Sequence, residues 1–274
     1  MLIDTHCHLD AAEFDADRTS VATAAFQQGI SAIVVPAVHR TNFDTVMQLA
    51  QTHVSVHYAL GIHPMYINRS QPQDVDVLKR YLQQNMHAQK PPMAIGEIGL
   101  DFFVTTENKD QQVYFFTEQL KLAKEFDLPV ILHVRRAVDD VLKYCRQYKL
   151  KGGIAHAFNG SRQQADEFIK LGFKLGFGGA MTYPRALKIR ELAATLPVEA
   201  IVLETDAPDI PPAWLQHEQG SRPRNTPLEL AKIAEVFASL RGLETPQVAD
   251  ITTKNALKIL PKILDLYTPP QVLL

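Results

Sequence analysis

Residues 2–10 read Leu2-Ile3-Asp4-Thr5-His6-Cys7-His8-Leu9-Asp10 and predict a short apolar strand that ends in two histidines. Side chains two apart on a strand point the same way, so His6 and His8 can direct both imidazoles at one point. Two imidazoles placed in this way can bind a metal ion. A His-x-His pair alone is a weak indication, because most such pairs are surface or half-buried residues. The remaining ligands must therefore be sought elsewhere in the chain.

Short runs rich in β-branched residues recur after this one, and each is followed by a stretch with helical periodicity. The further strands are expected at 31–36, 55–60, 93–97, 129–133, 153–156, 173–177 and 200–204. Helices are expected at 18–28, 41–52, 75–85, 109–126, 137–148, 161–171, 186–196, 226–240 and 245–260. Eight strands alternating with helices over roughly 250 residues predict an α/β fold, a (β/α)8 TIM barrel formed by residues 1–274 as a single domain. A doubly wound open sheet is the main alternative.

Composition narrows the class of protein. The 274 residues are 46% hydrophobic and carry a formal net charge of −2, so the whole surface is not a basic face for nucleic acid. The two cysteines, Cys7 and Cys145, lie far apart in the sequence, which favours free thiols and a reducing compartment. Neither a signal peptide nor a run of roughly 18 apolar residues is evident. We therefore expect a cytoplasmic protein with no membrane association and no obligate protein partner.

Polar side chains recur where the expected strands end. In a barrel of this type the chemistry lies at the C-terminal face, where strand ends and the following loops meet. A single buried histidine there is usually a hydrogen-bonded core residue, but a whole set would be costly to bury unless the groups are paired or bind metal. Five of the ten histidines belong to this set, which comprises His6, His8, His63, Glu97, His133, His156, Glu204 and Asp206.

The set predicts two divalent ions that share one carboxylate. The first ion would take His6, His8, Glu97 and Asp206, and the second Glu97, His133 and His156. Ions about 3.5–4 Å apart suit phosphoryl hydrolysis, because they activate water and neutralise the developing anion. Asp206 could also accept the proton of the water, which makes Asp206 and Glu97 the predicted catalytic residues. Imidazole ligands favour zinc, with manganese, cobalt, nickel or magnesium as alternatives.

With these residues in view, the chain resembles the TatD family of metal-dependent deoxyribonucleases. The matching stretches are 4–10, 61–64, 94–101, 128–133, 203–208 and 224–227. Residues 177–185 and the arginine pair after His133 are most similar to the YjjV-type branch of that family. The resemblance implies a (β/α)8 fold, a binuclear site on the six residues assigned above, cytoplasmic location and DNA as the substrate. Departures at Ala157, Asn159 and Val104 affect no proposed ligand and leave the substrate preference open.

A phosphodiester substrate needs positive or hydrogen-bonding groups around the site. The expected substrate-binding residues are His63, Arg135, Asn159 and Arg224, and further candidates are Arg136, Arg222 and Trp214, the last as a stacking surface for a base. Glu204 points the same way as Asp206 and could either orient a histidine or serve as an ordinary paired carboxylate. Cys7 points away from the histidines and is expected to be a buried spacer.

Three functions remain in competition. The first is a nuclease that acts on single strands or ends of DNA, because the net charge offers no basic groove along a duplex. The second is a small-molecule amidohydrolase, lactonase or phosphoesterase on the same barrel. Relatives of that kind often bridge their metals with a modified lysine, whereas here Glu97 occupies the place. The third is a binding protein that keeps the metals for structure.

Overall fold

The computed structural model describes residues 1–103, 108–215 and 223–265 of the chain. Within these ranges the eight strands are β1 (Leu2–Asp4), β2 (Ile30–Pro36), β3 (Val56–Ala59), β4 (Ile95–Asp101), β5 (Val130–Arg135), β6 (Gly153–Ala155), β7 (Lys174–Phe177) and β8 (Ile201–Leu203). The helices are α1 (Arg18–Gln27), α2 (Phe43–Thr52), α3 (Gln73–Asn85), α4 (Lys109–Glu125), α5 (Val138–Tyr148), α6 (Arg162–Lys170), α7 (Leu187–Thr195), α8 (Leu230–Arg241), α9 (Thr245–Ile259) and α10 (Lys262–Asp265).

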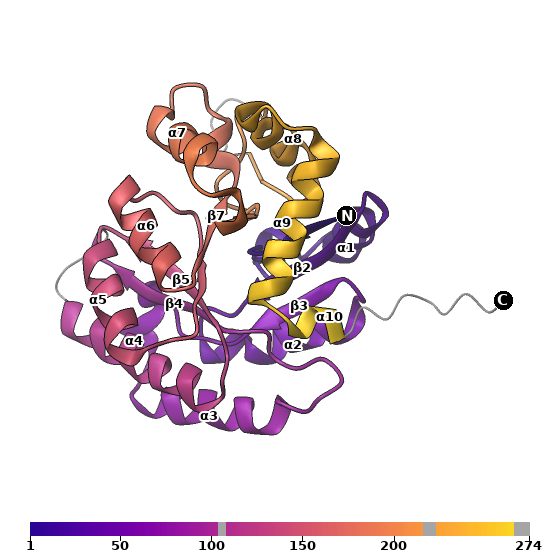
Figure 1. Ribbon diagram of the computed structural model, residues 1–274. Helices are drawn as coiled ribbons and strands as arrows, with labels where there is room; N and C mark the ends of the chain where they lie inside the picture. The colour runs from indigo at the N-terminus through magenta and orange to yellow at the C-terminus, as the bar shows by residue number, and fades with distance from the viewer. Residues whose placement is uncertain (104–107, 216–222, 266–274) are drawn as a thin grey trace.

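The strands are parallel and follow one another in chain order around a ring (Figure 1). Strands β1–β3 form one sheet and β4–β8 a second. Backbone hydrogen bonds cross both seams: Gly96 donates to Leu60 at 2.9 Å, and Thr5 donates to Leu203 at 3.1 Å. The first strand therefore adjoins the last, which confirms the predicted barrel and excludes the open doubly wound sheet.

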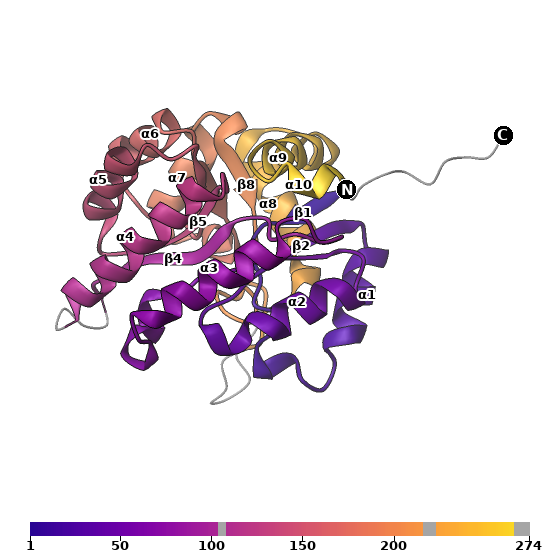
Figure 2. The same ribbon diagram turned by 90° about the horizontal axis from the view of Figure 1, so that it is seen from below.

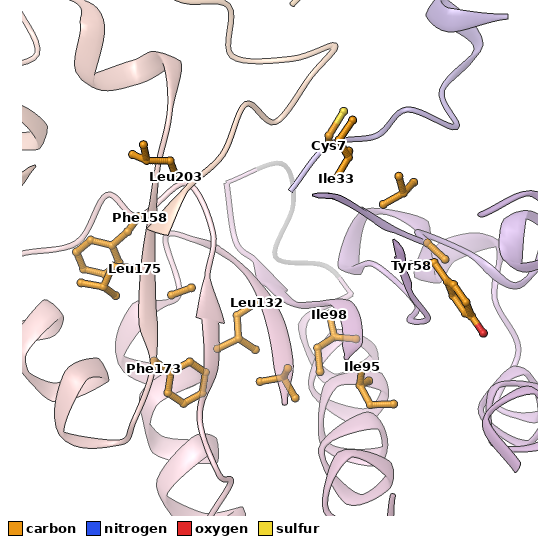
Figure 3. Packing of buried hydrophobic residues seen from close by; sticks show 14 of the residues in the cluster. Cys7, Ile33, Tyr58, Ile95, Ile98, Leu132, Phe158, Phe173, Leu175 and Leu203 are labelled. Carbon is orange, nitrogen blue, oxygen red and sulfur yellow. The ribbon is translucent and has the colours of Figure 1, made fainter. Parts of the chain in front are cut away.

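The apolar core has two layers, as a barrel requires when alternate residues of each strand point inward and outward. The outer layer lies between strands and helices, and Figure 3 shows part of it, with Leu132 and Phe173 among the buried side chains. The inner layer fills the barrel near the strand beginnings and includes Ile131. Ile131 and Leu132 are neighbours in β5 yet belong to different layers, which is the alternation expected of a barrel strand.

Helices α9 and α10 close the barrel at the end where the strands begin. Figure 1 shows α9 crossing in front of the strands, and Figure 2 shows α9 and α10 together on one side of the molecule. Ile259 and Ile263 are buried in the inner layer, and the Asn255 amide donates to the carbonyl oxygens of Val198 and Ile201 at 2.8 Å each. This end is therefore filled by apolar side chains, and the opposite end is left for the polar residues.

Local sequence explains several of the boundaries. The predicted N-cap Ser161 begins α6, and its hydroxyl accepts the amide proton of Gln164 at 3.1 Å. Strand β4 runs to Asp101, so the expected end at Glu97 was wrong, because Gly99 and Asp101 pair with His133 and Arg135 of β5. No helix within the described residues has the length and apolar character needed to cross a membrane.

Candidate metal centre

The structure brings all six predicted ligands together at the C-terminal ends of the strands. His6 and His8 follow β1, Glu97 lies inside β4, and His133 lies in β5. The other two come from segments that follow strands, His156 after β6 and Asp206 after β8. His63, which precedes the 3-10 helix η3 (Pro64–Arg69), joins the same cluster. Apart from the neighbours His6 and His8, these side chains are far apart in sequence, so the barrel itself assembles the cluster.

Glu97 is the centre of the cluster and is 2% exposed. Its Oε2 atom lies 3.3 Å from the Nε2 atoms of both His6 and His8. Its Oε1 atom faces three further imidazoles, at 2.9 Å from Nε2 of His156, 3.1 Å from Nδ1 of His133 and 3.3 Å from Nε2 of His63. Each carboxylate oxygen therefore faces a different set of nitrogens, which is the arrangement of a carboxylate that can bridge two cations.

Asp206 lies on the His6 side of Glu97. Its Oδ1 atom is 3.6 Å from Nε2 of His6 and 3.9 Å from Nε2 of His8. Its backbone has a left-handed φ of 56°, and its amide donates to the carbonyl oxygen of His6 at 2.9 Å. Three groups of side chains could each hold a cation: His6–His8–Glu97, His6–His156–Asp206 and His63–Glu97–His133.

Burial and charge act strongly on these groups. Burial alone would raise the pKa of Glu97, but the imidazoles of His63, His156 and His6 hold that pKa well below its usual range. Burial raises the pKa of Asp206 to about 6, and burial together with His156 lowers that of His6. So many ionisable groups are costly to bury without cations to compensate them. The donor set of imidazole nitrogens and carboxylate oxygens fits divalent transition metals.

Asp101 is a functional candidate that the sequence analysis did not assign. Its Oδ2 atom lies 3.0 Å from Nε2 of His133, and its Oδ1 atom accepts the amide proton of Phe103 at 2.9 Å. A carboxylate on one ring nitrogen of a histidine orients the other nitrogen toward a metal, and here Nδ1 of His133 faces Glu97. The sequence spacing could have indicated Asp101, because Glu97 and Asp101 are four residues apart and lie on the same face of one strand.

Gly99 allows β4 and β5 to approach closely enough for these contacts. It has a φ of 153°, and a Cβ atom at this position would lie 1.9 Å from the carbonyl oxygen of His133. Any side chain would therefore force the two strands apart. The glycine between Glu97 and Asp101 is thus needed to bring both carboxylates to the His133 ring.

Glu204 lies beside the His156 imidazole, on the other side of the cluster. It is 1% exposed, its Oε1 atom accepts the amide proton of Ala157 and it lies 3.7 Å from Nδ1 of His156. The carboxylate fits against Gly176 of β7, where a Cβ atom would lie 2.1 Å from Oε2. At 3.7 Å the Glu204 carboxylate contacts His156 electrostatically, while its hydrogen bond is to the Ala157 amide.

Asp4 joins the two chain segments that carry His6 and Asp206. Its carboxylate is fully buried and accepts the amide proton of Thr205 at 3.0 Å and the hydroxyl proton of Thr205 at 2.6 Å. The amide of His6 also donates to it, at 3.3 Å. Cys7, between the two histidines, is fully buried in the outer apolar layer, which confirms its predicted place as a spacer.

The expected substrate-binding residues lie in different places. His63 is buried against Glu97, whereas Arg135 and Asn159 are exposed near His133 and His156 in the sequence. Arg224 is bound elsewhere: its guanidinium donates to both carboxylate oxygens of Asp17, at 2.8 and 2.7 Å. Arg222 lies outside the described residues.

Trp214 is also engaged in local contacts. Its indole Nε1 donates to Oε2 of Glu229 at 2.6 Å, and the Lys232 ammonium lies 4.6 Å from the centre of its ring. The ring packs partly buried against the outer apolar layer. These contacts favour a packing role over the stacking surface for a base.

Comparison with known proteins identifies the family and agrees with the fold. Residues 3–261 match the family model described as TatD related DNase. The chain is 40% identical over 255 residues to the uncharacterized metal-dependent hydrolase YjjV of Escherichia coli, covering 92% of this chain and 95% of that protein. It is 31% identical over 273 residues to human deoxyribonuclease TATDN3, covering 96% and 95% of the two chains.

A solved structure shows the same similarity in three dimensions. The crystal structure of the TatD homologue YjjV from E. coli superposes with a TM-score of 0.86 at 38% identity, covering 95% of this chain and 98% of that one. The family model, matched over residues 3–261, spans every segment that contributes to the cluster around Glu97. The chain therefore belongs to the TatD family of metal-dependent hydrolases.

Proposed function

We propose that this protein hydrolyses phosphodiester bonds of DNA at a centre of two divalent ions that Glu97 bridges. The observation that carries the proposal is the division of the Glu97 carboxylate, with His6 and His8 on one oxygen and three imidazoles on the other. The first ion would be held by His6, His8, Glu97 and Asp206, and the second by Glu97, His133 and His156. Imidazole ligands favour zinc, and manganese, cobalt, nickel or magnesium are the alternatives to test.

Ions bound there would supply an activated water and would neutralise charge on the phosphate. Asp206 is the residue that we expect to take the proton from the attacking water. Its side chain is 13% exposed, whereas Glu97 is 2% exposed, so water entering from the mouth can reach Asp206. The left-handed backbone at Asp206 turns this carboxylate back toward His6 and His8.

His63 has a different part in this proposal. Its Nδ1 atom accepts the amide proton of Met65 at 3.1 Å, so in the neutral ring the proton sits on Nε2. Nε2 is the atom that faces Glu97, and a protonated nitrogen donates a hydrogen bond and does not bind a cation. Burial lowers the pKa of His63 to about 4, which keeps the ring neutral. We therefore assign Nε2 of His63 as a hydrogen-bond donor, which faces Glu97 in this structure and would donate to the phosphate or the leaving oxygen once substrate is bound.

DNA is the proposed substrate for two reasons. The family model is that of TatD-related DNases, and the human relative is named a deoxyribonuclease. The net charge of −2 provides no surface-wide attraction for a duplex, so single strands or ends are the expected form. Arg135 and Asn159 are the proposed contacts at the mouth, whereas the Arg224 guanidinium is bound to Asp17 and is left out.

The test is cleavage of labelled single-stranded DNA by the metal-loaded protein, beside a panel of esters, lactones and amides. Cleavage that needs a divalent ion and is lost in Glu97→Gln supports the proposal. The control is Glu167→Gln, because Glu167 pairs with Lys170 and Arg146 at the surface, away from the cluster. Turnover of a lactone, amide or other small ester while the DNA stays intact would refute it and favour the small-molecule alternative.

A further inference from the structure

An exposed aromatic ring flanked by two arginines lies beside the His133 end of the cluster. Phe103 is 47% exposed, which is unusual for a phenylalanine in this chain. The guanidinium carbon of Arg135 lies 3.7 Å from the centre of the Phe103 ring, and that of Arg136 lies 4.5 Å from it. We call these three side chains the Phe103 platform.

The backbone places the platform next to the proposed second ion. The amide of Phe103 donates to Oδ1 of Asp101, whose Oδ2 atom lies 3.0 Å from Nε2 of His133. The amide of Phe102 donates to the carbonyl oxygen of Arg135 at 2.9 Å. One buried carboxylate therefore holds both the platform and a proposed metal ligand.

Two consecutive arginines reach one ring because the chain turns between them. Consecutive side chains of an extended strand point in opposite directions. Arg136, directly after β5, has a left-handed φ of 54°, which a non-glycine residue rarely adopts. This turn lets the Arg136 side chain approach the same ring as Arg135, the last residue of β5. The left-handed position thus serves the platform.

The two guanidiniums are available to an anion. No carboxylate in the described part of the chain forms an ion pair with Arg135 or Arg136, and both side chains are exposed. Five other arginines of the chain are paired with carboxylates: Arg18 with Asp15, Arg40 with Asp74, Arg146 with Glu167, Arg162 with Asp166 and Arg224 with Asp17. The two guanidiniums are therefore stacked on Phe103 and can bind an anion beside the proposed metal centre.

We propose that the Phe103 platform binds the nucleotide next to the scissile phosphate, with its unpaired base stacked on Phe103 and the guanidinium planes and its phosphate held by the arginines. Aromatic rings and guanidinium planes both stack on exposed bases, and neither distinguishes strongly between bases. A base within a duplex cannot present its face in this way, so the platform selects single strands. This inference rests on the proposed function and names the form of DNA that the site takes.

The test is the affinity for a short fluorescent single strand, measured by anisotropy with the metal-loaded protein and with phosphorothioate linkages that slow hydrolysis. Phe103→Leu is expected to weaken binding by roughly 5- to 150-fold, the range for loss of one base stack. A strand with an abasic residue at the stacked position should weaken binding to the unaltered protein by a similar factor. That strand should bind Phe103→Leu no worse than the intact strand does, because the two changes remove the same contact.

The arginines are tested by the salt dependence of the same affinity. Arg135→Gln and Arg136→Gln should each reduce the slope of log affinity against log salt by about 0.7, the value for one phosphate contact of a single strand. The controls are Phe26→Leu in α1, where the ring is 46% exposed, and Arg80→Gln in α3; both should bind as the unaltered protein does.

The outcomes separate the platform from the nuclease activity. The platform is refuted if Phe103→Leu binds the strand as tightly as Phe26→Leu does. It is also refuted if an abasic residue, wherever it is placed in the strand, weakens binding equally for the unaltered protein and for Phe103→Leu. Either result would refute the platform even if the protein cleaves DNA. If Phe103→Leu and the abasic strand weaken binding as expected but the protein does not cut DNA, the platform stands and the proposed hydrolysis fails.

Discussion

Asp101→Asn tests whether the cluster holds two separate ions. The Asp101 carboxylate faces two groups at once, the amide of Phe103 through Oδ1 and Nε2 of His133 through Oδ2. An asparagine has one carbonyl oxygen and one amide nitrogen, so it can accept a proton from only one of these two groups. In either orientation of the amide, His133 loses the carboxylate that orients its Nδ1 atom toward Glu97.

The magnitude follows from this contact. Loss of a carboxylate that orients a metal-binding histidine typically lowers metal affinity by about 10- to 100-fold, which is about 1.4–2.7 kcal/mol at one site. Only the ion proposed for His133, His156 and Glu97 should be affected. The ion proposed for His6 and His8 has no contact with Asp101, so its affinity should change little.

Titration of the metal-free protein with zinc in competition with a chromophoric chelator measures both affinities. We expect two binding phases in the unaltered protein and a weakening of one phase in Asp101→Asn. The matched control is Asp74→Asn, because Asp74 is also buried and accepts a backbone amide proton but pairs with Arg40. A single phase in the unaltered protein, or equal weakening of both phases in Asp101→Asn, would refute the division of ligands described above.

Three other changes have defined outcomes. His63→Phe should lower kcat for DNA by about 100-fold while metal analysis still finds two ions per chain, because we propose His63 as a hydrogen-bond donor and not as a ligand; loss of an ion would contradict this proposal. Cys7→Ala should retain metal and activity and should lower the free energy of unfolding in urea by about 1–2 kcal/mol, since the thiol is a buried spacer. Burial, and then Lys90, lowers the pKa of His57 to about 4, so the unfolded chain binds this proton more readily and stability falls as the pH drops below about 6.5. Between pH 7.5 and 5 the loss due to His57 should be ~2 kcal/mol, and His57→Leu should lack that part of the decline in urea titrations.

The sequence predicted the barrel and the main polar cluster because both follow from local rules. Alternation of side chains placed His6 beside His8, and the order of strands and helices placed the strand ends at one face. It did not reveal that β4 continues past Glu97, because that depends on pairing with β5 through Gly99. A glutamate between glycines resembles a strand end until the partner strand is known.

The substrate-binding residues were harder to predict because their contacts come from distant segments. Arg224 resembled a free cation at the mouth, but its partner Asp17 is 207 residues away in sequence. Trp214 resembled a stacking surface, yet Lys232 and Glu229 of the following segment engage it. Phe103 could not be singled out from the sequence either, because the two arginines that contact its ring are brought there by the pairing of β4 with β5.

The layering of the barrel explains how so polar a site is tolerated in its mouth. Three strands show the same step from apolar to polar over two residues, since the inner-layer residues Ile131, Ile154 and Val202 are followed by His133, His156 and Glu204. Residues two apart share a face, so each polar group stands directly above an apolar one. The stability of the scaffold therefore comes from the layer beneath, which α9 and α10 close. This leaves the mouth free to hold buried charge and left-handed turns such as those at Arg136 and Asp206, the local irregularities that functional sites characteristically carry.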